Sequence, residues 1–125
     1  MTKEQALYLW FSQFGTVYVD TVMPVIDSDE IDYPYGTYEL AVSSFLRPVA
    51  ITFSWWERTT SLESSVLKIR EVEQALGRDG VIIPCDGGGI RIAPADPFVR
   101  TMSDDSDRMI RRTIFNLQIE YITEV

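Results

Sequence analysis

The sequence predicts an α+β fold: a mainly antiparallel sheet of four to five strands, with two helices packed on one face, in a single domain that spans residues 1–125. Two observations lead to this prediction. Two segments carry apolar residues at helical spacing behind capping signals, and much of the remaining chain alternates apolar with polar residues. Consecutive strands joined by short turns pair antiparallel, and helices with one apolar stripe pack on the resulting sheet.

The first helix is expected from about residue 3 to residue 14. Thr2 and Gln5 stand in capping-box register at its start, and Gly15 supplies a stop at its end. Apolar residues recur at helical spacing between these signals: Leu7, Trp10, Phe11 and Phe14.

A long exposed excursion and then two strands are expected after this helix. Residues 16–36 carry two prolines and an acidic cluster, so apart from a possible short strand at Val17–Val19 they are typical of a loop. Alternation with a period of two residues begins at Thr37 and resumes after Pro48. This pattern predicts two adjacent strands joined near residues 46–48.

Trp55 and Trp56 must point to opposite faces of the second of these strands, because side chains alternate along a strand. One ring therefore lies on the face that the two helices leave open, where a helix or a neighbouring subunit is expected to cover it. Packing is favoured over a stacking platform for nucleic-acid bases, since the neighbourhood is acidic and such platforms are surrounded by basic residues.

A second helix, a hairpin and a long strand complete the predicted fold. Thr60 and Glu63 stand in capping-box register, and Gly77 ends the helix. Its apolar stripe is expected to contain Leu62, Val66, Ile69 and Leu76. Residues 86–89 read Asp-Gly-Gly-Gly and predict a hairpin turn, and residues 115–121 alternate as in a strand with one buried face.

Composition excludes most catalytic classes. The chain has no histidine and one cysteine, Cys85, which rules out Ser-His-Asp, Cys-His and Cys/His zinc sites, as well as an internal disulfide. A calcium loop starting at Asp27 would place Asp32 where the turn glycine belongs. We therefore expect no enzyme activity, no cofactor and no metal; a hydrolase built on clustered carboxylates and a divalent metal is a minor alternative.

Charge is unevenly distributed along the chain. The net charge is -8, and between Glu4 and Phe45 there are seven acidic residues and no lysine or arginine. This balance argues against binding nucleic acid through its phosphates. No segment resembles a signal peptide or a membrane span, so a soluble chain without membrane contact is expected.

Acidic and basic residues gather in two regions that we interpret as a seam between subunits. The front cluster contains Asp27, Asp29, Glu30 and Asp32, and the second contains Asp104, Asp105, Asp107, Arg108, Arg111 and Arg112. An acidic front and a basic back can match head to tail between copies and close into a ring. The alternative is a solvated loop with local ion pairs that contribute little.

Several segments together resemble a family of small tail-completion proteins of long-tailed bacteriophages, the tail terminators, which are also called minor capsid proteins. They read LYLWFSQFG, VMP, YPYGTYEL, WWERTTS and PFVRTMSDDSDRMIRRTIFNLQIEY, and they cover almost the whole chain. The most specific parts are the aromatic first helix with the following proline-containing loop, and the segment from Phe98 to the last strand.

The resemblance implies a virion structural protein at the head–tail interface, made in the host cytoplasm. It would form a hexameric ring that caps the tail tube, contacts the tube protein and the head–tail connector protein, and lets DNA pass through its channel without sequence-specific binding. The alternative from a different class is a small acidic adaptor or inhibitor that binds another protein through its front loop and stays monomeric or dimeric.

Overall fold

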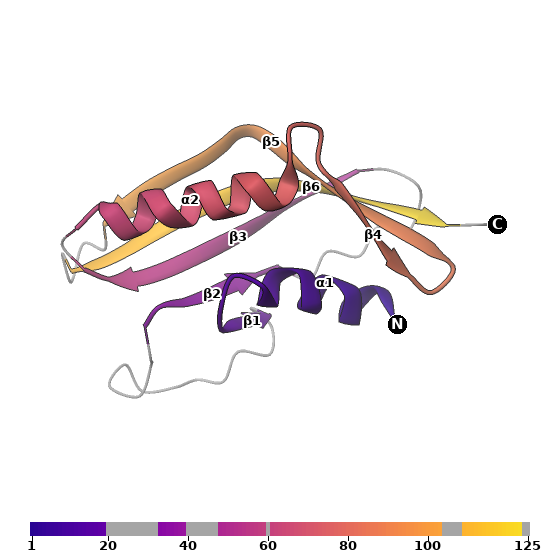
Figure 1. Ribbon diagram of the computed structural model, residues 1–125, viewed down its shortest axis with the longest axis horizontal. Coiled ribbons are helices and arrows are strands. Elements are labelled where there is room, and N and C mark those ends of the chain that lie inside the picture. Colours follow the sequence, from indigo (N-terminus) through magenta and orange to yellow (C-terminus); the bar gives the residue numbers. More distant parts are fainter. Residues whose placement is uncertain (20–32, 40–47, 60, 104–108, 124–125) are drawn as a thin grey trace.

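The computed structural model describes residues 1–19, 33–39, 48–59, 61–103 and 109–123 (Figure 1). Along this part of the chain the elements are α1 (Lys3–Ser12), β1 (Val17–Val19), β2 (Tyr35–Tyr38), β3 (Val49–Arg58), α2 (Glu63–Leu76), β4 (Val81–Cys85), β5 (Gly88–Ser103) and β6 (Ile110–Thr123). The α+β class with two helices is confirmed.

The strands form one curled, mixed sheet in the order β1-β2-β3-β6-β5-β4. Only the β1–β2 pair is parallel, and the other four pairs are antiparallel. The expected four to five strands were too few, since the sheet has six. The three residues of β1 pair with Gly36, Thr37 and Tyr38, a contact that alternation over so short a segment cannot reveal.

The β5 strand is longer than the short hairpin strand that the sequence predicts. It runs for 16 residues and continues through two prolines, because its register against β6 shifts between Pro94 and Val99. The side-chain amide of Asn116 donates to the carbonyl oxygen of Pro97 at 2.9 Å across this irregular stretch. An irregularity of this kind lets a strand contain prolines that would otherwise end its ladder.

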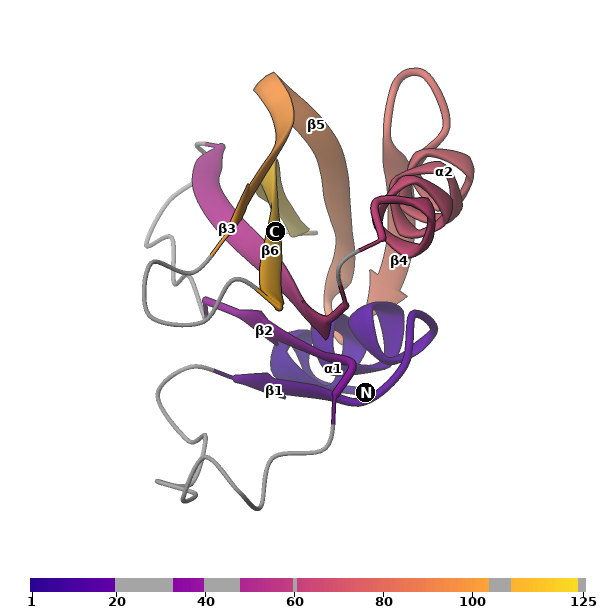
Figure 2. The ribbon, with the colours of Figure 1, turned by 90° about the vertical axis from the view of Figure 1, so that its left-hand side faces the viewer.

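One hydrophobic core lies between the sheet and both helices. The sheet curls so that α1 and α2 lie on the same side of it (Figure 2). Phe53 of β3 is fully buried at its centre, with its ring centroid 4.9 Å from Phe11, 5.8 Å from Phe14 and 5.7 Å from Phe115. The other face of the sheet carries no described helix, and we call it the helix-free face.

The first helix begins as predicted. Thr2 and Gln5 form both hydrogen bonds of the capping box, and Leu7, Trp10 and Phe11 are buried. The helix ends at Ser12, two residues earlier than expected, because the chain turns toward β1 with Gly15 at φ 137°.

The second helix differs from its predicted start and stripe. Its N-cap is Leu62 without a side-chain cap, so the predicted capping box is wrong; Thr60 itself lies outside the described residues. The hydroxyl of Ser61 instead accepts the amide of Glu63 at 3.1 Å. Leu62 and Val66 are 55% and 45% exposed. The buried positions are Ser65, Val72 and Leu76.

The hairpin and the strand alternation follow the prediction. β4 and β5 are joined by Asp86 and Gly87, with Gly87 at φ 79° as an Asp-Gly turn requires. The free Cys85 is half-buried against the core. Trp55 is buried on the helix side and Trp56 lies on the helix-free face, as alternation demands. The expected turn near residues 46–48 lies largely outside the described residues.

Candidate functional site

Most of the predicted seam lies outside the described residues. This holds for Asp27, Asp29, Glu30, Asp32, Asp104, Asp105, Asp107 and Arg108. Arg111 and Arg112 are described, and both lie near the start of β6, opposite the end of β3. The seam stays a prediction, and the described structure shows what these two arginines do inside their own subunit.

Arg112 holds two strands and an aromatic ring together on the helix-free face. Its Nε and Nη2 atoms donate to the hydroxyl of Ser54 at 3.0 and 2.9 Å. Its guanidinium carbon lies 4.8 Å from the ring centroid of Trp56, so the cation covers the indole. The indole in turn donates to the hydroxyl of Thr37 at 3.2 Å and stacks on Tyr35. The expected cover for Trp56 is thus supplied in part by its own chain.

Arg111 points to the opposite face of β6, where it donates from Nε to the carbonyl oxygen of Thr59 at 3.3 Å. Its Cα is in register with that of Glu57 on β3. The two seam arginines therefore serve different faces of the sheet. A single partner surface that lies flat against one face contacts one of them and not the other.

Aromatic, methionine and arginine side chains gather on the helix-free face. Tyr35 contacts Tyr18 and Tyr33 as well as Trp56, with ring centroids 6.1, 5.3 and 6.2 Å away. Burial, helped by the neighbouring Tyr33 and Tyr18, raises the pKa of the Tyr35 phenol to about 12. Arg100 and Met102 of β5 pair with Ile114 and Arg112 of β6, which places both on this face, and both are exposed.

The helix side carries a pocket, lined in part by charged residues, that the sequence pattern did not reveal. This Glu57 pocket has a volume of about 490 Å³ and lies between β3, the start of α2 and the turn that follows α1. Its lining includes Trp55, Glu57, Ser64, Lys68 and Glu71. The sequence did contain a signal for its central residue: the alternation of Val49, Ile51, Phe53 and Trp55 continues to Glu57, which puts a carboxylate on the buried face.

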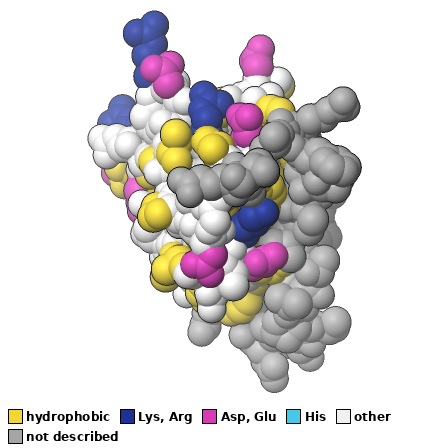
Figure 3. All heavy atoms as spheres, turned by 90° about the vertical axis from the view of Figure 1, so that its right-hand side faces the viewer, with side chains coloured by type: hydrophobic (Ala, Val, Ile, Leu, Met, Phe, Trp, Pro, Cys, Tyr) yellow, Lys and Arg dark blue, Asp and Glu magenta, His cyan; other side chains and the backbone are white. Residues whose placement is uncertain are grey.

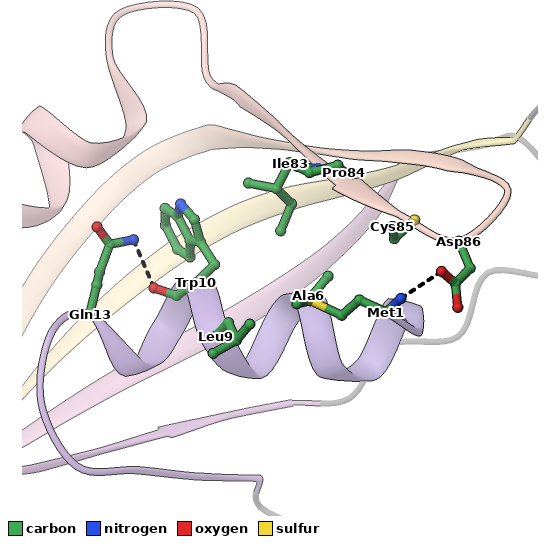
Figure 4. A pocket seen from close by; sticks show the side chains of 9 residues that line it. All are labelled: Met1, Ala6, Leu9, Trp10, Gln13, Ile83, Pro84, Cys85 and Asp86. Carbon is green, nitrogen blue, oxygen red and sulfur yellow. Dashed lines mark hydrogen bonds and ion pairs between the residues drawn. The ribbon is translucent and has the colours of Figure 1, made fainter.

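A second, mostly apolar groove of about 600 Å³ separates α1 from β4 (Figure 4). Leu9 and Trp10 of α1 face Ile83 and Pro84 of β4 across it. The ion pair between the N-terminal ammonium of Met1 and Asp86 closes one end. Figure 3 shows this end of the molecule, where apolar side chains reach the surface as separate spots among polar and charged groups.

The described residues contain no group of three or more side chains suited to hold a metal ion. No helix in the described part of the chain is long and apolar enough to cross a membrane. Comparison with protein-family models, with curated proteins and with solved structures finds no match for this chain.

Proposed function

We propose that this protein is a structural component of a bacteriophage virion: a tail terminator that caps the tail tube and joins it to the head connector as a ring. The observation that carries the proposal is the composition of the helix-free face. Half-buried tyrosine, tryptophan and arginine side chains lie there beside the exposed Arg100 and Met102. Protein–protein interfaces favour these residue types over ordinary surface. Met102 in particular is 47% exposed there.

The form of the assembly follows from where the candidate surfaces lie. The helix-free face and the Glu57 pocket are on opposite sides of the sheet, so a contact between them joins unlike surfaces. Unlike surfaces produce head-to-tail contacts, which close into a ring when the rotation between copies permits. The resemblance to tail terminators adds the expected number of six subunits and the expected neighbours, the tube protein and the connector protein.

The net charge suits a channel through which DNA passes. With -8 on every subunit, a ring repels the DNA backbone and gives it no site to bind. No enzymatic step enters this function. The alternative of a small acidic adaptor requires a monomer or dimer, so the oligomeric state in solution discriminates between the two.

Native mass spectrometry and electron microscopy of the purified protein test the proposal. We expect closed rings of six subunits, and a chain that remains monomeric or dimeric at every concentration would contradict it. Met102→Glu should weaken the ring because it places a charge on the helix-free face. Tyr8→Glu is the matched control, since Tyr8 of α1 is similarly exposed at 49% but lies away from that face.

A further inference from the structure

Glu57 is a nearly buried carboxylate with unused hydrogen-bonding capacity. It is 8% exposed, and its Oε1 atom accepts the hydroxyl of Ser65 at 3.2 Å. Ser65 is its only hydrogen-bond partner among the described residues, although an ionised carboxylate accepts about four hydrogen bonds. No buried side-chain oxygen or nitrogen among the described residues lacks a hydrogen-bond partner, so the other carboxylate oxygen of Glu57 is open to the pocket that it lines. A donor that enters the pocket can reach this oxygen.

The lysine that lines the pocket is used elsewhere. Lys68 donates to Glu71 at 2.9 Å and to the carbonyl oxygen of Phe14 at 2.7 Å, and its ammonium lies 4.2 Å from the ring centroid of Trp55. It neutralises Glu71 and leaves the charge of Glu57 without a counterpart among the described residues that line the pocket. The residues that line the pocket therefore carry net negative charge beside an aromatic wall, an environment that suits a planar guanidinium. Arg111 of β6 is in register with Glu57 on the same face of the sheet but is not part of the pocket lining.

The helix-free face carries a guanidinium that has no partner in the described part of its own chain. Arg112 donates to Ser54, and Arg58 also interacts within the chain. Arg100 of β5 is exposed and makes no hydrogen bond or ion pair with the described residues. Its pairing with Ile114 directs it away from the helices, to the side of the sheet opposite the Glu57 pocket.

We propose that Arg100 of one copy inserts its guanidinium into the Glu57 pocket of the next copy. This inference rests on the proposed ring and names the contact that joins its subunits. Because donor and acceptor lie on opposite faces of one sheet, the contact is head to tail, and every subunit both donates and accepts once. A two-fold symmetric dimer would need Arg100 and the pocket within one self-complementary patch, whereas they lie on opposite faces of the sheet.

Arg100→Glu is the first test, measured by native mass spectrometry against the wild-type ring. Loss of a hydrogen-bonded charge pair weakens each interface by about 30-fold or more, so rings should give way to monomers. Arg78→Glu is the matched control, because Arg78 after α2 is also an exposed arginine and its replacement changes the net charge by the same amount. Equal loss of assembly in both variants would assign the effect to net charge and overturn the contact.

The acceptor is tested with Glu57→Gln, which keeps the hydrogen bond from Ser65 and removes the charge. Leu67→Arg provides a second acceptor variant on the pocket rim, where Leu67 is 57% exposed and an arginine can occupy the pocket from its own subunit. Circular dichroism confirms that each variant is folded. Either folded acceptor variant should lose the ring, and two folded variants that assemble like the wild type would refute the contact.

Mixing the donor and acceptor variants gives the sharpest outcome. An Arg100→Glu copy retains its pocket, and a Glu57→Gln copy retains its arginine, so one junction can form between them and the opposite junction cannot. We expect one-to-one heterodimers, identified by their masses, and no ring. Monomers only, or mixed rings, would overturn the inference. A wild type that never assembles defeats the ring itself, whereas an Arg100→Glu ring defeats this contact alone.

Discussion

Replacing Arg112 with lysine separates a structural role of this arginine from a role at the seam. The charge is kept, but the two donors that reach Ser54 at 3.0 and 2.9 Å and the planar cover of Trp56 are lost. A hydrogen bond from a charged donor contributes about 1.5–3 kcal/mol, and both donors share one oxygen. Lysine retains part of the cation–π attraction of about 0.5–1 kcal/mol. We therefore expect a loss of about 1–2 kcal/mol in the free energy of unfolding.

This loss should lower the melting temperature by about 4–8 °C in a domain of this size. The measurement is urea and thermal unfolding followed by circular dichroism, at two protein concentrations, so that unfolding is separated from subunit dissociation. Arg100→Lys on the same face is the control and should change stability by less than about 0.5 kcal/mol. An Arg112→Lys subunit as stable as the wild type yet unable to assemble would refute the structural assignment and place this guanidinium at the interface.

Two further predictions concern the fold. A Cβ at Gly80 would lie 2.5 Å from the carbonyl oxygen of Ile92, whereas one at Gly77 would meet nothing within 4 Å, although both residues have positive φ. Both alanine variants should show backbone strain of about 1–2 kcal/mol, with Gly80→Ala measurably less stable in urea; equal losses would show that the neighbouring strand yields freely. Burial raises the pKa of Tyr35 and Tyr38 to about 12 from 10. The unfolded chain therefore releases these protons first, and stability should fall as pH rises from 10 to 12. Spectroscopic titration in which all six tyrosines ionise together near pH 10 in the folded protein would contradict this.

The sequence predicted those parts of the fold that depend on local periodicity. Trp55 and Trp56 were assigned to opposite faces because a strand alternates, and the structure places them so. The capping box of α1 was recognised because its two partners are three residues apart. The extent of the buried face of α2 was not predicted correctly. Leu62 and Val66 match the apolar period of the helix, but no sheet covers them and both are exposed. Helix periodicity shows which residues share a face, and only the packing of distant strands shows how far that face is covered.

The Glu57 pocket was missed for a related reason. Ser65 is buried in α2 because its hydroxyl meets a carboxylate eight positions earlier on a different element. No helical pattern identifies a serine as a core residue. The strand pattern through Glu57 was readable, but an inward carboxylate gains meaning only when the surrounding charges are known. Lys68 and Glu71 are three residues apart on one helix, a spacing that allows them to pair. The bond from Lys68 to Phe14 spans 54 residues and cannot be predicted from spacing.

Salt dependence distinguishes the Glu57 pocket from the predicted seam as the source of attraction between subunits. At physiological ionic strength the Debye length is about 8 Å, so exposed charges are screened well before buried ones. The repulsion between subunits of charge -8 is an exposed effect and weakens with salt. Attraction at an exposed seam through Arg111 and Arg112 would also weaken as salt rises. Glu57, at 8% exposure, would retain most of its attraction for a docked guanidinium.

If the pocket joins the subunits, moderate salt should preserve or strengthen the wild-type ring while Arg100→Glu stays unassembled. Light scattering over a salt series decides the matter: a ring that dissociates steadily as salt rises, in wild type and Arg78→Glu alike, would place the attraction in the exposed seam and remove the pocket from this role.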